Sequence, residues 1–581
     1  MGENLAEKKV AEKKVFVRKA TGLVREIGFL TAILIVVCNM VGLGWQKRLF
    51  QFTGKAIVPE NTFVLGLPPI VMAFILVGIV VLFTVWIFAI LGAAMPRSGG
   101  GYVYISRIIH PAVGYAGSVL EFWSIAVSYG LIGTAVFEAI TIYAWMAGWG
   151  TAWATPEVLL VGGIIIVALF GALASFGVRM AGLLLQTIFW IPAAITIILY
   201  GMLLTATPQT LTTGIQNLTG MLPSNFTNTA LGQGMATAFT GGYWGAVDVA
   251  ILGAYWAYIG FAASTFVAGE IKEVAKNLPK TLFLANGVVI ALYISISYLA
   301  ANAARMVGAP TGIYAGQPYS FFSAYAFMSF GGGTLPAGVG KAWMPNIAGF
   351  AASGAGMNWF LALIPIFAAL WVANDIPPFI LTSSRIIFAM AFDRVLPEKL
   401  AEVNERWHTP IYAVLVTVLV AFVGNFAESN VFVDPKSLLY LGSGNIVGTF
   451  LNADVGVVAT DIWDVLFFLL ASLAGLMLVF RKKDIYDKSA YKPSIGGLQL
   501  VTVVGLIATV TNVWLLWRIA LGWPWDFPTQ YDITTGGGTW SAWVMTLVII
   551  IVSLILYYYY KSKGSRIGVD YSTIYAEIPP E

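Results

Sequence analysis

The sequence predicts an all-α integral membrane protein with about twelve transmembrane helices. Of its 581 residues, 59% are hydrophobic and only 10% are charged, whereas soluble proteins carry about 25% charged residues. The mean hydropathy is +0.82, and the apolar residues fall in serial runs that are long enough to cross the ~30 Å core of a bilayer as helices. Serial runs of this kind, in place of short alternating strands, favour helices over a barrel.

Twelve apolar runs give the expected order of the helices. The third and the eighth are unusually long, so we expect them to be tilted or to extend beyond the bilayer. The runs lie near residues 27–50, 69–95, 112–148, 157–175, 180–205, 249–270, 282–304, 357–391, 410–427, 462–480, 497–521 and 541–560.

The runs divide the chain into two sets of five helices, followed by two more helices. Because five is an odd number, the two sets cross the membrane in opposite orientations. The expected segments are a basic tail (1–25), helices one to five (26–205), an extracellular loop (206–248), helices six to ten (249–481), helices eleven and twelve (482–560) and a C-terminal tail (561–581). The loop contains both sequons of the chain, at Asn217 and Asn225, which is consistent with glycosylation.

The Lys and Arg residues predict the orientation of the chain in the cell membrane. The N-terminus offers no cleavable signal peptide and begins instead with a charged tail. If that tail is cytoplasmic, all but seven of the 32 basic residues lie on the cytoplasmic side, as the positive-inside bias requires. Both termini are therefore expected inside the cell. The seven exceptions are Lys47, Arg48, Lys55, Arg305, Lys341, Lys436 and Arg518.

The composition also argues against several classes of function. A single cysteine, Cys38, excludes an intrachain disulfide and a cysteine metal cluster. His110 and His408 fall at predicted helix ends, which argues against a histidine metal site in the membrane. We see no GxxxxGK[ST] motif and no nucleophile–base pair at membrane depth, so direct use of ATP and an enzymatic function are disfavoured. We expect no cofactor, no metal and no nucleic-acid partner.

Glycines interrupt the first and the sixth apolar runs near their middles. Gly42 and Gly44 lie two positions apart, which is costly for helix continuity, and Gly260 lies among bulky residues. Close helix packing is the alternative explanation, but packing glycines favour a spacing of four. Interruptions at matching positions of two inverted halves instead predict broken helices at a binding site. The amides of Gly42, Leu43 and Gly44 would then form a helix N-terminus that can hold a carboxylate.

Four stretches resemble the amino acid–polyamine–organocation permease superfamily, which has the LeuT-type fold. Residues 39–45 (NMVGLGW) resemble the family's Gly-x-Gly break, and residues 95–115 resemble its glycine-rich connector between helices two and three. Residues 255–282 resemble helix six with its basic exit, and residues 384–413 resemble the junction of helices eight and nine. Helices eleven and twelve match only by topology. The resemblance implies a 5+5 inverted repeat with broken helices one and six, and a secondary transporter of amino acids.

The resemblance also implies the binding site. The amides of residues 42–44 would receive the substrate carboxylate, and carbonyls around residues 38–40 and 256–259 would accept its ammonium group. Leu43 departs from the polar residue often found between the two glycines, which leaves the backbone amides alone to bind. The side-chain pocket lacks an acid, which argues weakly against a cationic substrate. The expected substrate-binding residues are Cys38, Asn39, Met40, Gly42, Leu43, Gly44, Trp123, Trp256, Ala257, Tyr258, Ile259, Gly260, Phe261 and Phe379.

Asp375 is the main candidate for coupling transport to protons. Placing a carboxylate in mid-membrane costs about 2.5–3.5 kcal/mol of insertion free energy, so we expect Asp375 to have a functional or structural role. One interpretation is that Asp375 takes up a proton that accompanies the substrate; the other is that it caps backbone groups freed by Pro377 and Pro378, or pairs with Asn374. Glu121 is a weaker candidate. Some proton-coupled relatives carry a lysine in helix five, but residues 183–198 contain none, so coupling through that lysine does not carry over.

Two other functions compete with amino acid transport. A carrier of polyamines or other organic cations would need an acid in the pocket and no carboxylate site. A nutrient receptor could keep the carboxylate site yet bind without transport. Uptake into proteoliposomes distinguishes the receptor from either carrier.

Overall fold

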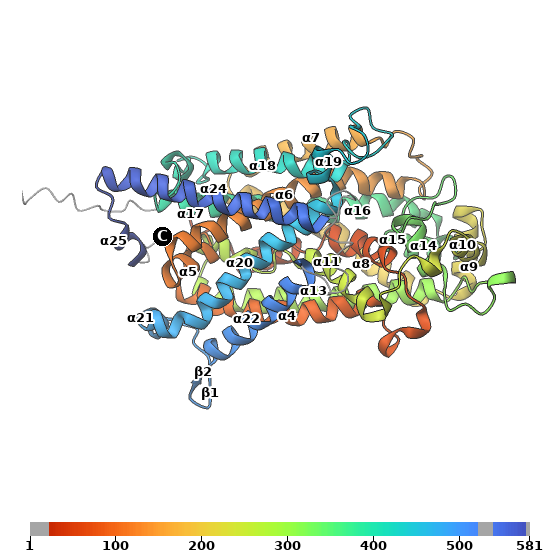
Figure 1. Ribbon diagram of the computed structural model, residues 1–581, viewed down its shortest axis with the longest axis horizontal. Coiled ribbons are helices and arrows are strands. Elements are labelled where there is room, and N and C mark those ends of the chain that lie inside the picture. The colour runs from red at the N-terminus through yellow and green to blue at the C-terminus, as the bar shows by residue number, and fades with distance from the viewer. Residues whose placement is uncertain (1–22, 521–537, 577–581) are drawn as a thin grey trace, which may run out of the picture.

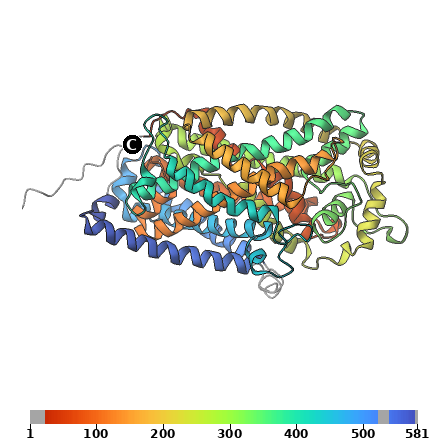
Figure 2. The same cartoon turned by 90° about the horizontal axis from the view of Figure 1, so that it is seen from above.

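The computed structural model describes residues 23–520 and 538–576, so most of the predicted basic tail and the last five residues lie outside the described part of the chain. The predicted all-α class is confirmed: long helices run side by side along one axis in both views (Figures 1 and 2). Within the described residues, the strands are two short antiparallel ones, β1 (Ser494–Ile495) and β2 (Leu498–Gln499).

Ten helical spans among the described residues are long and apolar enough to cross a membrane. The other two predicted spans are the two interrupted ones, described below. The ten are α4 (Pro69–Ala94), α6 (Pro111–Ala144), α7 (Pro156–Ala174), α8 (Val178–Thr205), α13 (Val274–Arg305), α16 with α17 (Leu363–Asn374 and Ile376–Phe392), α18 (Ile411–Ser429), α20 (Ala453–Arg481), α22 (Leu500–Ala520) and α24 (Gly538–Arg566).

The long helix α6 forms the centre of the bundle. In its most apolar stretch 83% of the residues are buried, against 28% in α24. It packs against α18, α20, α16 and α17, which carry the polar side chains described below. An apolar helix that keeps most of its residues exposed, like α24, is suited to face lipid tails.

Shorter helices gather at the two ends of the bundle (Figure 1). One end, here called the α9 end, carries α9 (Pro208–Thr219), α10 (Pro223–Gly232), α14 (Phe321–Phe330) and α15 (Met344–Gly354). The opposite end, the α25 end, carries α5 (Gly101–Ile108), α21 (Lys483–Lys488) and α25 (Tyr571–Ala576). The segment expected as a loop over 206–248 is thus largely helical, and both sequon asparagines, Asn217 and Asn225, are exposed on it.

Among the helices that begin earlier than the apolar runs predicted, two gain turns that contain acidic residues. The helix α11 (Gly242–Tyr258) starts before residue 249, and α20 starts before residue 462. The added turns contain acidic residues, which lowered the local hydropathy. Two of those acids form ion pairs within the protein: Lys55 lies 2.7 Å from Asp454, and Arg518 lies 3.2 Å from Asp248. The earlier start of α20 places Asp461 and Asp464 on the same helical face.

The C-terminal helix α25 packs against α5 and the end of α17. The hydroxyl of Tyr575 lies 3.3 Å from that of Tyr102, and the hydroxyl of Tyr571 donates to the carbonyl of Arg394 at 3.1 Å. Asp570 accepts from Ser572 and Thr573 at the start of α25, and these hydrogen bonds lower the pKa of Asp570 to about 2. The helix α25 is therefore packed against the bundle.

Candidate functional site

Both glycine-marked helices are broken, as predicted. The first half-helix, α2 (Phe29–Cys38), ends at Cys38, and the chain turns through residues 39–43 before η1 (Gly44–Arg48) and α3 (Leu49–Lys55) continue without interruption. The second, α11, ends at Tyr258, and α12 (Ala263–Phe266) begins after four intervening residues. Gly260 has a φ of 101°, a value that side chains with a Cβ rarely adopt.

The two breaks lie against each other, and glycines make the contact possible. A Cβ on Gly44 would lie 2.4 Å from the Cα of Ala257, and a Cβ on Gly260 would lie 2.6 Å from the side chain of Asn39. Helix interruption and close packing are thus not exclusive explanations of these glycines. The same residues interrupt the helices and let the interrupted backbones approach each other. The backbone of residues 39–44 therefore lies against that of residues 257–260.

Side chains of α13 bridge the carbonyls exposed at the breaks. The hydroxyl of Tyr293 lies 2.9 Å from the carbonyl of Ala257 and also in hydrogen-bonding contact with that of Met40, so its one proton can go to either. Asn286 donates to the carbonyl of Phe261 at 2.9 Å. Tyr293 therefore links the C-terminal ends of both half-helices.

Tyr293→Phe should lower both stability and transport. Removing the hydroxyl leaves two buried carbonyls with one donor fewer, which costs about 1–3 kcal/mol. The matched control is Tyr129→Phe, since the Tyr129 hydroxyl joins α6 to the carbonyl of Val167 in α7, away from the breaks. We expect both variants to lose heat resistance in detergent, and only Tyr293→Phe to lose transport in proteoliposomes, by about tenfold. Equal transport by the two variants would contradict a role for Tyr293 at the site.

Asp375 lies at the break of the first helix. It separates α16 from α17, directly before the two prolines that begin α17. Its carboxylate accepts a hydrogen bond from the amide of Leu43, and a Cβ on Gly42 would lie only 1.9 Å from Oδ2. Both side-chain polar atoms of Asn374 lack a hydrogen-bond partner, so Asp375 caps the backbone of helix one and is not paired with its neighbour.

The predicted aromatic residues do not converge on one pocket. Trp256 lies under the guanidinium of Arg48, 4.6 Å from the ring centre, and the Tyr258 hydroxyl donates to the carbonyl of Phe74 in α4. Phe261 contacts Phe468 with ring centroids 4.2 Å apart. Trp123 is half-buried.

Two of the remaining predicted residues lie on other helices. Trp123 faces Trp463 of α20, with ring centroids 6.4 Å apart. Trp463 in turn donates to Thr546 of α24 at 2.9 Å. Phe379 is buried on the first turn of α17, one turn after Asp375.

Glu121, a coupling candidate from the sequence, belongs to a group of buried acids beside the breaks whose other members, Asp461 and Asp464, sequence reasoning missed. Glu121 of α6 and Asp464 of α20 lie in hydrogen-bonding contact with each other. The hydroxyl of Tyr255 of α11 donates to Asp464 at 2.5 Å. Asp461, one turn before Asp464, is fully buried, and neither of its carboxylate oxygens has a hydrogen-bond partner. The sequence does contain these two acids three positions apart. The predicted helix ten began after Asp461, however, so the two were not recognised as neighbours on one helical face.

These acids do not make a metal site. Within the described ranges, no group of three or more His, Cys, Asp or Glu side chains is arranged to hold a metal ion. A carboxyl group accepts hydrogen bonds when ionised and can donate one when protonated, so the contact of Glu121 with Asp464 is open to a shared proton.

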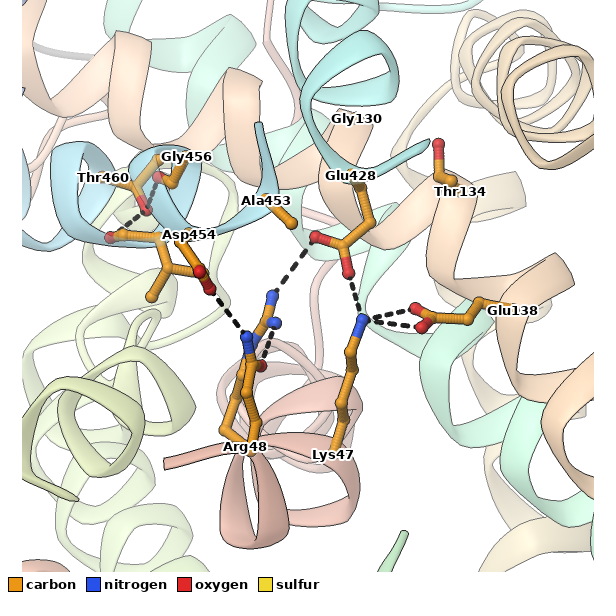
Figure 3. A network of polar contacts seen from close by, with 12 residues as sticks. Lys47, Arg48, Gly130, Thr134, Glu138, Glu428, Ala453, Asp454, Gly456 and Thr460 are labelled. Carbon is orange, nitrogen blue, oxygen red and sulfur yellow. Dashed lines mark hydrogen bonds and ion pairs between the residues drawn. The ribbon is translucent and has the colours of Figure 1, made fainter. Parts of the chain in front are cut away.

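A buried ion cluster joins three helices on the α9 side of the breaks (Figure 3). The ammonium of Lys47 lies 2.6 Å from Glu138 of α6 and 2.7 Å from Glu428 of α18. Arg48 contacts the other oxygen of Glu428 at 3.4 Å and donates to Gln51 at 2.6 Å. A cavity of about 690 Å³ lies next to this cluster, lined by Lys47 and Glu138 among others. The cluster thus separates the breaks from a polar cavity.

Further buried ion pairs lie on the α25 side. Arg385 of α17 binds Glu270 of η5 (Ala268–Glu270) through two hydrogen bonds of 2.9 and 3.0 Å, and both side chains are 1% exposed. Asp393 accepts from Arg107 at 2.8 Å and from Tyr102 at 3.0 Å. The breaks are therefore enclosed between ion pairs on both sides.

Comparison with known proteins points to one family. A family model described as amino acid permease matches residues 27–555. The chain is 24% identical to the Asc-type amino acid transporter 1 of Mus musculus, over 69% of this chain and 66% of that protein. It is 24% identical to the serine/threonine exchanger SteT of Bacillus subtilis, over 69% and 76%. It is 26% identical to the large neutral amino acids transporter small subunit 2 of Mus musculus, over 68% and 64%. The chain thus spans just under two thirds of the two mouse relatives.

Proposed function

The chain belongs to the amino acid permease family, and we propose that it is a secondary transporter of amino acids. It moves them across the cell membrane by alternating access. The observation that carries the proposal is the pair of helices interrupted at one site, with amides of residues 43–44 and carbonyls of residues 40 and 257 exposed there. An amino acid zwitterion carries the two charges that such helix ends bind.

The proposed binding mode uses the backbone of both breaks. Among the described residues, no backbone carbonyl accepts from the amides of Leu43 or Gly44, as expected for the first turn of a helix. The substrate carboxylate binds there. The ammonium group binds the carbonyls of Met40 and Ala257, which Tyr293 now contacts.

Alternating access requires that each end of the bundle can close. The cluster of Lys47 with Glu428 closes the path to the α9 end, and the pair of Arg385 with Glu270 closes the path to the α25 end. The bias of basic residues supports an extracellular α9 end and a cytoplasmic α25 end with both termini inside.

We propose neutral amino acids as substrates. The names of the relatives, which include a serine/threonine exchanger and a transporter of large neutral amino acids, support this class, as do the apolar side chains of Leu43 and Phe261 at the breaks. Transport is coupled to protons or runs as exchange, and Asp375 and Glu121 are the candidate proton carriers. A second candidate substrate class is organic cations, because Glu121, Asp461 and Asp464 lie next to the site.

Counterflow into proteoliposomes tests this function. Vesicles preloaded with an unlabelled compound receive the same labelled compound at pH 5.5 and 7.5, with L-leucine, L-serine, L-lysine and putrescine in parallel. We expect counterflow of leucine or serine, and none of lysine or putrescine. Protein-free vesicles and Gly44→Val, which fills the contact with Ala257, are the controls. Counterflow of lysine or putrescine alone would favour the cation carrier, and binding without counterflow would favour a receptor.

A further inference from the structure

The carboxylate of Asp375 occupies the position expected for the substrate carboxylate. An ideal Cβ on Gly42 would lie 1.9 Å from Oδ2 and 2.3 Å from both Cγ and Oδ1, so the carboxylate lies flat against the backbone of the break. It accepts from the amide of Leu43, the residue before η1. Its other oxygen, Oδ1, is buried without a hydrogen-bond partner, and the residue is only 3% exposed.

The helix end that Asp375 contacts can hold one carboxylate. The helical run from Gly44 to Lys55 is continuous, and the amides of its first turn have no partner within the helix. Such an end carries a partial positive charge that favours an anion. Two carboxylates at the same end would repel each other strongly, because charges interact more strongly in a buried site than in water.

Nothing else near Asp375 offers a positive charge. The titratable side chains that face it are Cys38 at the end of α2 and Tyr293 of α13. Neither a thiol nor a phenol can become a cation. In the described part of the chain, the end of helix one is therefore the positive partner of Asp375.

We propose that Asp375 is an internal competitor for the carboxylate of the substrate, and that a proton on Asp375 releases the amides of helix one to the substrate. This inference rests on the proposed function and gives it a coupling mechanism. The proton comes from water on the side to which the site is open and forms an O–H bond on Asp375. That bond breaks when the substrate leaves on the other side and the Asp375 carboxylate returns to Leu43. One proton thus crosses with each amino acid.

A second buried acid group offers a different route for the proton. Glu121 and Asp464 lie in contact, and Tyr255, Asp461 and Arg48 face them from α11, α20 and η1. Glu121 and Asp464 do not contact the amides of helix one. A proton on either acid would therefore leave the competition between the carboxylates of Asp375 and the substrate unchanged. Glu121→Gln and Asp375→Asn therefore distinguish the two routes, because each variant removes one candidate proton carrier and leaves the other.

Proton uptake on binding tests the proposal. Purified full-length protein in weakly buffered detergent solution receives L-leucine between pH 5.5 and 8.5, with a pH indicator for protons and calorimetry for affinity. At the alkaline end we expect the wild type to take up about one proton per leucine bound and its affinity to fall about tenfold per pH unit. Asp375→Asn, which is neutral at every pH, should take up none and bind with a pH-independent affinity. Glu121→Gln removes the other candidate proton carrier and should still take up about one proton per leucine bound, because Asp375 remains.

Several results would overturn the inference. They are proton uptake by Asp375→Asn, loss of uptake in Glu121→Gln, or leucine binding to the wild type without a proton. Leucinol, which lacks the carboxylate, provides a test on the wild type alone, since its binding should take up no proton. Failure of the wild type to bind leucine or any other amino acid of the counterflow panel would instead contradict the proposed function itself.

Discussion

Gly42→Ala should abolish transport and destabilise the protein. The new Cβ would lie 1.9 Å from Oδ2 of Asp375, a distance far inside van der Waals contact, and Asp375 is held in place by the helical turns on both sides of it. Overpacking of a buried site costs about 1–3 kcal/mol and often more when backbone must shift. We expect counterflow to fall at least about a hundredfold, with a clear loss of heat resistance in detergent.

The control for this prediction lies on the same helix. Gly28 precedes α2, and a Cβ there would meet nothing within 4 Å, so Gly28→Ala should transport like the wild type. Combining Gly42→Ala with Asp375→Ala removes the clashing carboxylate and should restore part of the lost heat resistance, though not transport. Wild-type counterflow by Gly42→Ala would mean that the break of helix one does not hold the carboxylate of Asp375 in the transporting protein.

Glu428→Gln should be the most destabilising change in the ion cluster. The Glu428 side chain is fully buried and contacts both Lys47 and Arg48, so its neutralisation leaves two buried cations with one remaining acid. Breaking a buried pair by removing one partner costs about 3–5 kcal/mol, because the other charge stays desolvated. The fraction of protein that survives heating in detergent, followed by size-exclusion chromatography, measures the effect.

Glu138→Gln is the matched control within the same cluster. Glu138 contacts Lys47 alone, and its side chain is 12% exposed beside the polar cavity. Lys47 keeps Glu428 in this variant, and water can reach the site. We expect a loss of heat resistance well below that of Glu428→Gln. Equal losses in the two variants would show that the number of acids matters and that the double contact of Glu428 does not.

Transport should respond to the same two variants in the same order. Glu428 joins α18 to η1, in the second half of the first helix, and Lys47 extends the link to α6 through Glu138. A weaker cluster should leave the path to the α9 end open for longer, so uptake should fall even at temperatures where the protein remains folded. Counterflow at 20 °C separates this effect from unfolding.

Properties that depend on one stretch of chain followed from the sequence alone. The free energy of placing a segment in a bilayer is close to a sum over its residues, so the runs predicted the ten continuous spans and the two interrupted ones. The breaks were also predictable, because Gly42, Gly44 and Gly260 weaken a helix by their own conformational freedom. The cost of a carboxylate in the membrane likewise identified Asp375 without knowledge of its neighbours.

Properties that depend on which helices are neighbours were decided only by the tertiary structure. Lys47 meets acids that are 91 and 381 positions away, and Tyr255 meets Asp464 across 209 positions. Hydropathy counts these side chains as costs, because it cannot include the partners that offset them. It therefore started helix ten after Asp461, whereas α20 begins at Ala453. The contact of Asp375 with the amide of Leu43 is of the same kind: the sequence contains both groups, but only the packing of α17 against helix one brings a carboxylate to a helix end.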